Sequence, residues 1–126
     1  MSSIGRYVGH SHAPNISFSV VRFVTKNGAD PDIATIEDFG RVVDAITRTG
    51  EGVWKVALKE KRLANFVIPT VESDTGDTEV RATTAKQQGS SAANYVTVTA
   101  ETAGSASDIP GDTIVLLLLF SGSAAP

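Results

Sequence analysis

The chain contains no cysteine, so its 126 residues offer no disulfide, no thiolate metal site and no cysteine nucleophile. Aromatic residues are also scarce, with one Trp, two Tyr and five Phe in the whole sequence. A concave site lined by exposed aromatic rings, which a sugar-binding module would need, therefore has little to draw on. The length itself suits a single domain with an ordinary hydrophobic core.

Positive charge is not in excess either. The sequence holds 11 Lys and Arg against 14 Asp and Glu, a formal net charge of −3. Proteins that bind bare nucleic acid favour a basic surface, so this balance argues against that function. The first residues also lack the apolar segment of a signal peptide, and we expect a protein made and assembled in a cytoplasm.

The only long apolar run covers residues 114–120, and its seven residues are too few to cross a bilayer, which needs about 20. A half-exposed strand alternates apolar and polar residues, and this run does not. We therefore expect a strand over residues 112–120 that is covered on both faces, inside one domain or between copies. Closed symmetry would hide such a surface, so we expect an oligomer, with a homotrimer preferred and a dimer next.

Strand-like segments recur at intervals of about ten residues and are separated by turn residues. They cover residues 16–24, 41–47, 53–58, 64–72, 79–85 and 94–101. The pattern predicts an all-β fold, a β-sandwich or jelly-roll-like barrel of about 7–8 antiparallel strands. The clearest hairpin joins residues 41–47 to 53–58, because Gly50 and Gly52 suit its turn.

The remaining segments have weaker patterns. Residues 1–15 carry few apolar side chains, so we expect an extended N-terminal arm followed by one β domain over residues 16–126. Residues 32–40 have a helical spacing of apolar residues, but their length allows a short helix at most. Residues 86–93 and 103–111 are predicted to be polar loops.

No group of residues has the spacing of a known catalytic or metal site. His10 and His12 could act as metal ligands, although a solvated arm is the simpler interpretation. An acidic stretch could bind calcium, but it does not match the EF-hand spacing; it contains Glu72, Asp74, Asp77 and Glu79. We therefore expect no enzyme activity and no catalytic, cofactor or metal site.

A small basic cluster and the single Trp are the other candidates for binding. The cluster comprises Lys55, Lys59, Lys61 and Arg62, and it could touch an acidic partner surface or simply be a charged hairpin end. Trp54 lies in a strand-like segment, where burial of its ring would stabilise the core by several kcal/mol. We therefore expect Trp54 in the core rather than in a ligand site.

Two stretches of the chain resemble small virion proteins of tailed bacteriophages. The first is the run V-x-x-I-T-R-T-G-x-G-V-W-x-V-x-L at residues 43–58, and the second is D-I-P-G-D-T-I-V-L-L-L-L-F at residues 108–120. Some of these virion proteins look like capsid decoration (cement) proteins, which cover the outside of the head and clamp neighbouring hexamers. The resemblance spans residues 41–120 in pattern.

The resemblance implies a β-sandwich or jelly-roll-like body, self-association on the capsid lattice and no enzyme activity. The expected partners are the major capsid protein and other copies of the chain, without nucleic acid or membrane, and the expected location is the capsid surface of the virion. Residues expected to touch a partner are Arg6, Tyr7, Val8, His10, His12, Lys59, Lys61 and Arg62. Two alternatives remain open: a tail, head-fibre or baseplate component, and a ligand- or sugar-binding β-sandwich module.

Overall fold

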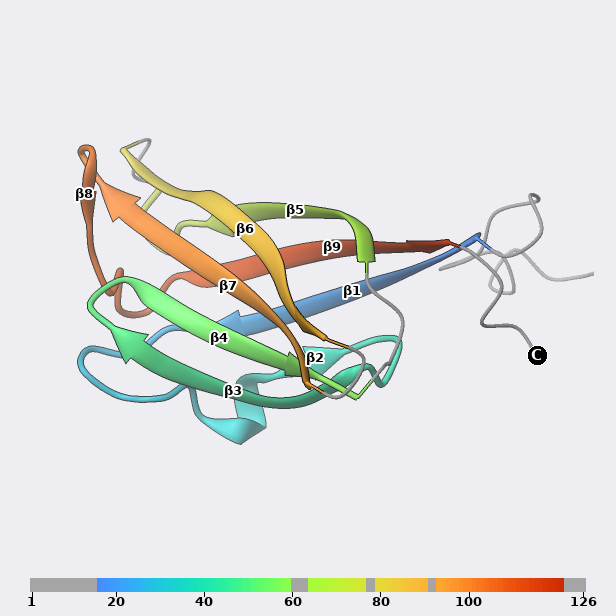
Figure 1. Ribbon diagram of the computed structural model, residues 1–126. Helices are drawn as coiled ribbons and strands as arrows, with labels where there is room; N and C mark the ends of the chain where they lie inside the picture. Colours follow the sequence, from blue (N-terminus) through green and yellow to red (C-terminus); the bar gives the residue numbers. More distant parts are fainter. Residues whose placement is uncertain (1–15, 60–63, 77–78, 91–92, 122–126) are drawn as a thin grey trace, which may run out of the picture.

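Two antiparallel sheets pack face to face in the computed structural model, which describes residues 16–59, 64–76, 79–90 and 93–121 (Figure 1). The first sheet has the strand order β2-β1-β9-β5, and the second has the order β3-β4-β7-β6, with β8 paired to β7. The sheets do not close into a barrel. The prediction of an all-β sandwich is therefore confirmed.

Four of the eight strand connections cross from one sheet to the other in the described part of the chain, which contains nine strands. They are β1 (Ile16–Val24), β2 (Glu37–Asp38), β3 (Val43–Gly50), β4 (Val53–Leu58), β5 (Ala64–Glu72), β6 (Val80–Ser90), β7 (Ala93–Thr102), β8 (Ser105–Ala106) and β9 (Thr113–Ser121). A 3-10 turn, η2 (Ile33–Thr35), precedes β2. The bounds predicted for β1, β4 and β5 agree with the structure.

Two of the predicted loops are wrong in part. Residues 86–90 continue β6, which pairs with β7 from Val80↔Thr102 to Ser90↔Ala93. Their polar composition concealed this, because a ladder of backbone hydrogen bonds does not require apolar side chains. Residues 103–111 contain the two-residue β8, and the ambiguous stretch 32–40 contains both η2 and β2.

The hydrophobic core lies between the sheets and is built from alternate residues of the central strands. Its fully covered members include Val21, Phe23, Trp54, Val56, Val96, Val98, Ile114, Leu116, Leu118 and Phe120. The Trp54 ring meets the Phe23 ring edge-on, with the ring centroids 6.2 Å apart. Trp54 therefore belongs to the core, as its sequence context indicated.

The terminal strand β9 lies in the middle of its sheet, between β1 and β5. Its residues alternate strictly in burial: Leu116 and Leu118 are fully covered, whereas Leu117 and Leu119 are half-buried. Within one chain, β9 is thus fully covered on one face only. The expected cover of its second face would have to come from another molecule.

Candidate interaction surfaces

The side of the first sheet that faces away from the core is apolar across three strands. We call this surface the outer sheet face; it comprises Phe18, Val20, Phe66, Ile68, Val115, Leu117 and Leu119. Phe66 and Ile68 are the most accessible, at 62% and 52% exposure, and the other five are half-buried. Single exposed apolar residues are ordinary, but a contiguous group of this kind marks an interaction site.

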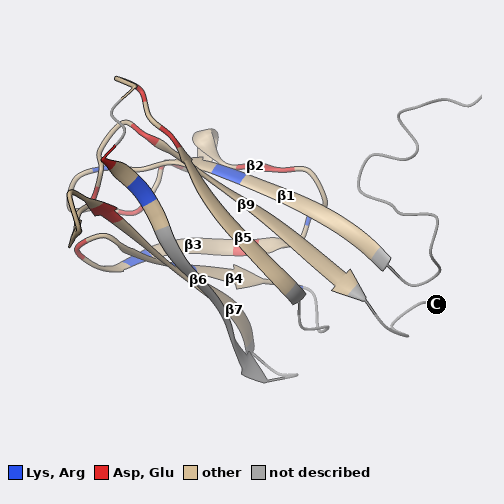
Figure 2. Ribbon diagram, turned by 90° about the horizontal axis from the view of Figure 1, so that it is seen from above, with Lys and Arg blue, Asp and Glu red and all other residues tan. Residues whose placement is uncertain are grey.

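Strand register places these residues in rows across the sheet. Leu119 lies between Phe18 and Phe66, and in the next row Leu117 lies between Val20 and Ile68. Directly opposed side chains in antiparallel pairs are close enough to touch, so the rows form one continuous surface. Figure 2 shows that β9 and most of β1 and β5 carry no charged residue.

The beginning of β1 has its amphipathic pattern turned outward. Its alternation would place Phe18 and Val20 in a core if the strand were judged alone. In the structure Ser19 faces inward and is 7% exposed, next to the turn at Gly40. Val21 and Phe23 point into the core, and successive side chains of a strand point to opposite sides. Phe18 and Val20 therefore point outward.

Charged side chains close one end of the outer sheet face. Arg22 of β1 binds Glu37 of β2 (Nη1 to Oε1, 3.2 Å) and Glu72 of β5 (Nη2 to Oε1, 2.7 Å). Arg22 and Glu72 lie on strands either side of β9, so the pair spans the central strand. The apolar surface therefore extends from this network toward the end of the sandwich where β1 begins and β9 ends (Figure 1).

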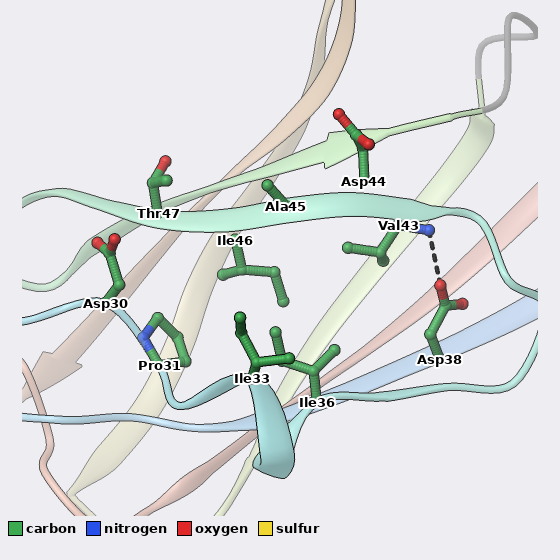
Figure 3. Close-up of a pocket in the computed structure, with 10 residues that line it drawn as sticks. All are labelled: Asp30, Pro31, Ile33, Ile36, Asp38, Val43, Asp44, Ala45, Ile46 and Thr47. Carbon is green, nitrogen blue, oxygen red and sulfur yellow. Dashed lines mark hydrogen bonds between the residues drawn. The ribbon is translucent and has the colours of Figure 1, made fainter.

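A second feature is a groove of about 530 Å³ along the open edge of β3, which we call the β3 groove (Figure 3). Val43 and Ile46 point from β3 toward Ile33 and Ile36, whereas Asp44 points away from this space (Figure 3). Pro31 also lines the groove. Ile33 is 86% exposed, which is unusual for so large an apolar side chain.

Two carboxylates mark the ends of the β3 groove. Asp38 accepts hydrogen bonds from the backbone N–H groups of Val42 (3.0 Å) and Val43 (2.7 Å). At the other end, Asp30 accepts one from the N–H of Arg48 (2.8 Å). These contacts occupy part of the open edge of β3 and leave the segment between them accessible.

Asp108 forms a polar cluster at the end of the sandwich opposite to that where β1 begins and β9 ends (Figure 1). Its carboxylate, 6% exposed, binds the Arg48 guanidinium at 2.9 and 3.0 Å and the N–H groups of Gly28 and Gly52. The hydrogen bond with Arg48 lowers the pKa of Asp108, and the same bond raises the pKa of Arg48. Because it ties three turns together, this cluster is part of the scaffold.

Most of the partner-contact residues predicted from the sequence lie outside the described residues: Arg6, Tyr7, Val8, His10, His12, Lys61 and Arg62. Lys59 is described; its side chain is exposed and its N–H donates to the Val42 carbonyl at 2.7 Å. Lys55 lies over the Tyr95 ring, 4.5 Å from its centroid. Of the basic cluster, the structure thus describes Lys55 and Lys59 alone.

The metal candidates also fall partly outside the described ranges, since His10, His12 and Asp77 are not among them. Glu72 is engaged by Arg22, and the N–H of Asp74 donates to Asp112 at 2.8 Å. In the part of the chain that the structure describes, no three His, Asp or Glu side chains gather as metal ligands would. Nor does that part contain a helix of the length and apolarity that a membrane crossing requires.

Sequence reasoning missed Phe66 and Ile68, the most exposed members of the outer sheet face. Their signal was the unbroken Phe66-Val67-Ile68 run in a segment whose Pro69 already indicated an edge strand. Asp108 was also missed, because its partners lie 60 and 56 residues away, at Arg48 and Gly52.

No known protein family, curated protein or solved structure matches the chain.

Proposed function

We propose that this protein is a structural component of a bacteriophage virion that binds the outside of the capsid and stabilises it, as decoration (cement) proteins do. Its partners are the major capsid protein and other copies of the chain, in closed groups such as trimers, and it acts without catalysis. The outer sheet face is the observation that carries the proposal. The resemblance of residues 43–58 and 108–120 to phage virion proteins supports the identity of the partner.

The outer sheet face is suited to a permanent contact. Its central residues, Leu117 and Leu119, come from the middle strand of the sheet, and their neighbours on both sides are apolar. Burial of apolar area contributes about 25 cal/mol per Å², so a few hundred Å² stabilise an assembly substantially. The Arg22 network at one end limits how far a partner can extend along the sheet.

The groove does not favour a sugar-binding module. Its lining contains Ile33, Ile36 and Ile46 but no aromatic ring among the residues that the structure describes, and the single Trp lies in the core. Sugar recognition relies on exposed aromatic faces with a few polar groups beside them. The apolar outer sheet face is better suited to contact with another sheet or with the capsid.

Mass spectrometry of gradient-purified phage particles, separated into heads and tails, tests the proposed function. We expect the chain in the head fraction at a copy number comparable with that of the major capsid protein. Its presence in tails alone would favour the tail, head-fibre or baseplate alternative. Absence from both fractions would contradict the proposal.

A further inference from the structure

The β3 groove is an open sheet edge with room beside it. β3 is the last strand of its sheet, so the backbone groups on one of its sides meet no described strand. Arg48 directs its N–H toward that side, to Asp30, and in an antiparallel pair the direction repeats every second residue. Ile46 therefore presents its N–H and C=O to the groove, where an extended segment can pair with them.

The chemistry of the groove defines what fits it. Its floor is apolar, with Ile36, Val43 and Ile46 beneath an exposed Ile33. Its two ends carry Asp30 and Asp38, whose carboxylates accept hydrogen bonds from backbone N–H groups within the described part of the chain. The groove therefore suits an extended segment with a bulky apolar side chain and positive charge beside it.

Residues 1–15 of this chain have that composition. They contain Arg6 and two histidines but no Asp or Glu, and Tyr7 and Val8 follow Arg6 directly. A fully extended stretch of 15 residues spans about 50 Å, which is enough to reach another molecule. Charge complementarity with Asp30 and Asp38 would guide this segment to the groove.

The direction of β1 favours a second copy as the recipient. β1 begins at Ile16, five residues before Val21 pairs with Asp38 of β2. The start of β1 at Ile16 therefore lies beyond β2, on the side away from the groove of the same chain. We propose that residues 1–15 of one copy bind in the β3 groove of a second copy, where they pair with Ile46 and place Tyr7 or Val8 against Ile33 and Ile36.

This inference goes beyond the proposed function and does not depend on it, because it concerns isolated copies of the chain. The natural absence of cysteine allows a clean test with single thiols. Val8→Cys is placed in a tagged copy and Ile33→Cys in an untagged copy, and the mixture is oxidised at micromolar concentration. Glu51→Cys, an exposed residue of the β3–β4 turn, replaces Ile33→Cys in the control.

We expect a disulfide-linked species that contains both copies, at twice the 13.2 kDa mass of the chain. The Glu51→Cys control should give at least tenfold less of it. Adding Arg6→Glu to the tagged copy should lower the yield about tenfold, since a favourable charge contact becomes a repulsive one. A yield equal to that of the control would overturn the inference.

A double variant, Val8→Cys with Ile33→Cys, separates exchange between copies from binding within one chain. We expect its intramolecular disulfide to form poorly at nanomolar concentration, where copies rarely meet. Efficient closure at that concentration, with no mixed species at micromolar concentration, would overturn the proposed second copy. Absence of the chain from phage particles would leave this inference untouched, and failed cross-linking would leave the virion proposal standing.

Discussion

Leu117 and Leu118 are adjacent in β9 but have opposite environments, so the same substitution should have different consequences at the two positions. Leu118 points between the sheets and is fully buried, whereas Leu117 lies half-buried on the outer sheet face. We expect Leu118→Asp to prevent folding. We expect Leu117→Asp to fold and to lose its association with partners.

The magnitudes follow from burial. Removing the buried Leu118 side chain loses about 2–3 kcal/mol of transfer free energy. An unpaired carboxylate in its place costs several kcal/mol more. A domain of this size has only about 5–15 kcal/mol of stability, so little or none remains. The carboxylate of Leu117→Asp stays hydrated, and we expect it to lower the free energy of unfolding by about 1 kcal/mol.

Two assays separate these effects. Denaturant unfolding is followed by the fluorescence of Trp54, which is unique in the chain and fully buried. Light scattering at micromolar concentration reports the oligomeric state. Ala57→Asp is the matched control, because Ala57 is half-buried in β4, a central strand of the other sheet. We expect this control to leave association unchanged.

Three results would refute the reasoning. A folded Leu118→Asp protein of normal stability would mean that this position is not in the core. A Leu117→Asp protein that associates like the original would mean that the outer sheet face is not a contact. A clean monomer of the unaltered chain, which also stays monomeric on the particle, would contradict the expected oligomer.

Two further predictions concern the scaffold. Gly52 has φ +73°, and an added Cβ would lie 2.5 Å from the Ser107 backbone N, whereas Gly50 has open space around it. We therefore expect Gly52→Ala to cost more than about 2 kcal/mol in denaturant unfolding and Gly50→Ala to cost little; equal losses would contradict this. The hydrogen bond to Arg48 is the main cause of the lowered pKa of Asp108. The ionised carboxylate therefore stabilises the fold at pH values above the ordinary carboxyl pKa of about 4. This contribution is lost as the pH falls through the pKa of Asp108 in the folded state. We expect Asp108→Asn to cost about 2 kcal/mol at pH 7 and progressively less in acid, and a pH-independent difference would contradict the assignment.

Local patterns in the sequence were sufficient for the strands with apolar periodicity. β1, β4 and β5 follow from two-residue alternation or apolar runs, and the β3–β4 hairpin follows from its glycines. β6 was predicted too short because its last residues are polar and are held by pairing to β7. Backbone pairing with the next strand leaves no signal in the side-chain composition of residues 86–90.

The surfaces were harder to predict than the strands. The unbroken apolar run of β9 predicted cover on both faces, inside one domain or between copies. Within one chain only one face is fully covered, and the run did not indicate which one. That assignment depends on which alternate residues of each strand point into the core. Val21 and Ile114 face inward, so Phe18 and Leu117, an odd number of residues away, face outward. The β3 groove depends on η2 and β3 lying together across the edge of the sandwich, which no local pattern in residues 32–40 encodes.

The central claim is that a partner covers the outer sheet face when the protein is assembled on the phage head. The most direct test is thiol labelling of Ile68→Cys, a position 52% exposed in the single chain, with Glu51→Cys in the exposed turn as the reference. Both variants are labelled as dilute isolated protein and again in purified phage heads assembled with them. We predict that the labelling rate of Ile68→Cys falls at least tenfold in the heads while that of Glu51→Cys changes little. Equal labelling of Ile68→Cys in the two states would show that the face stays open to solvent, and would contradict the account.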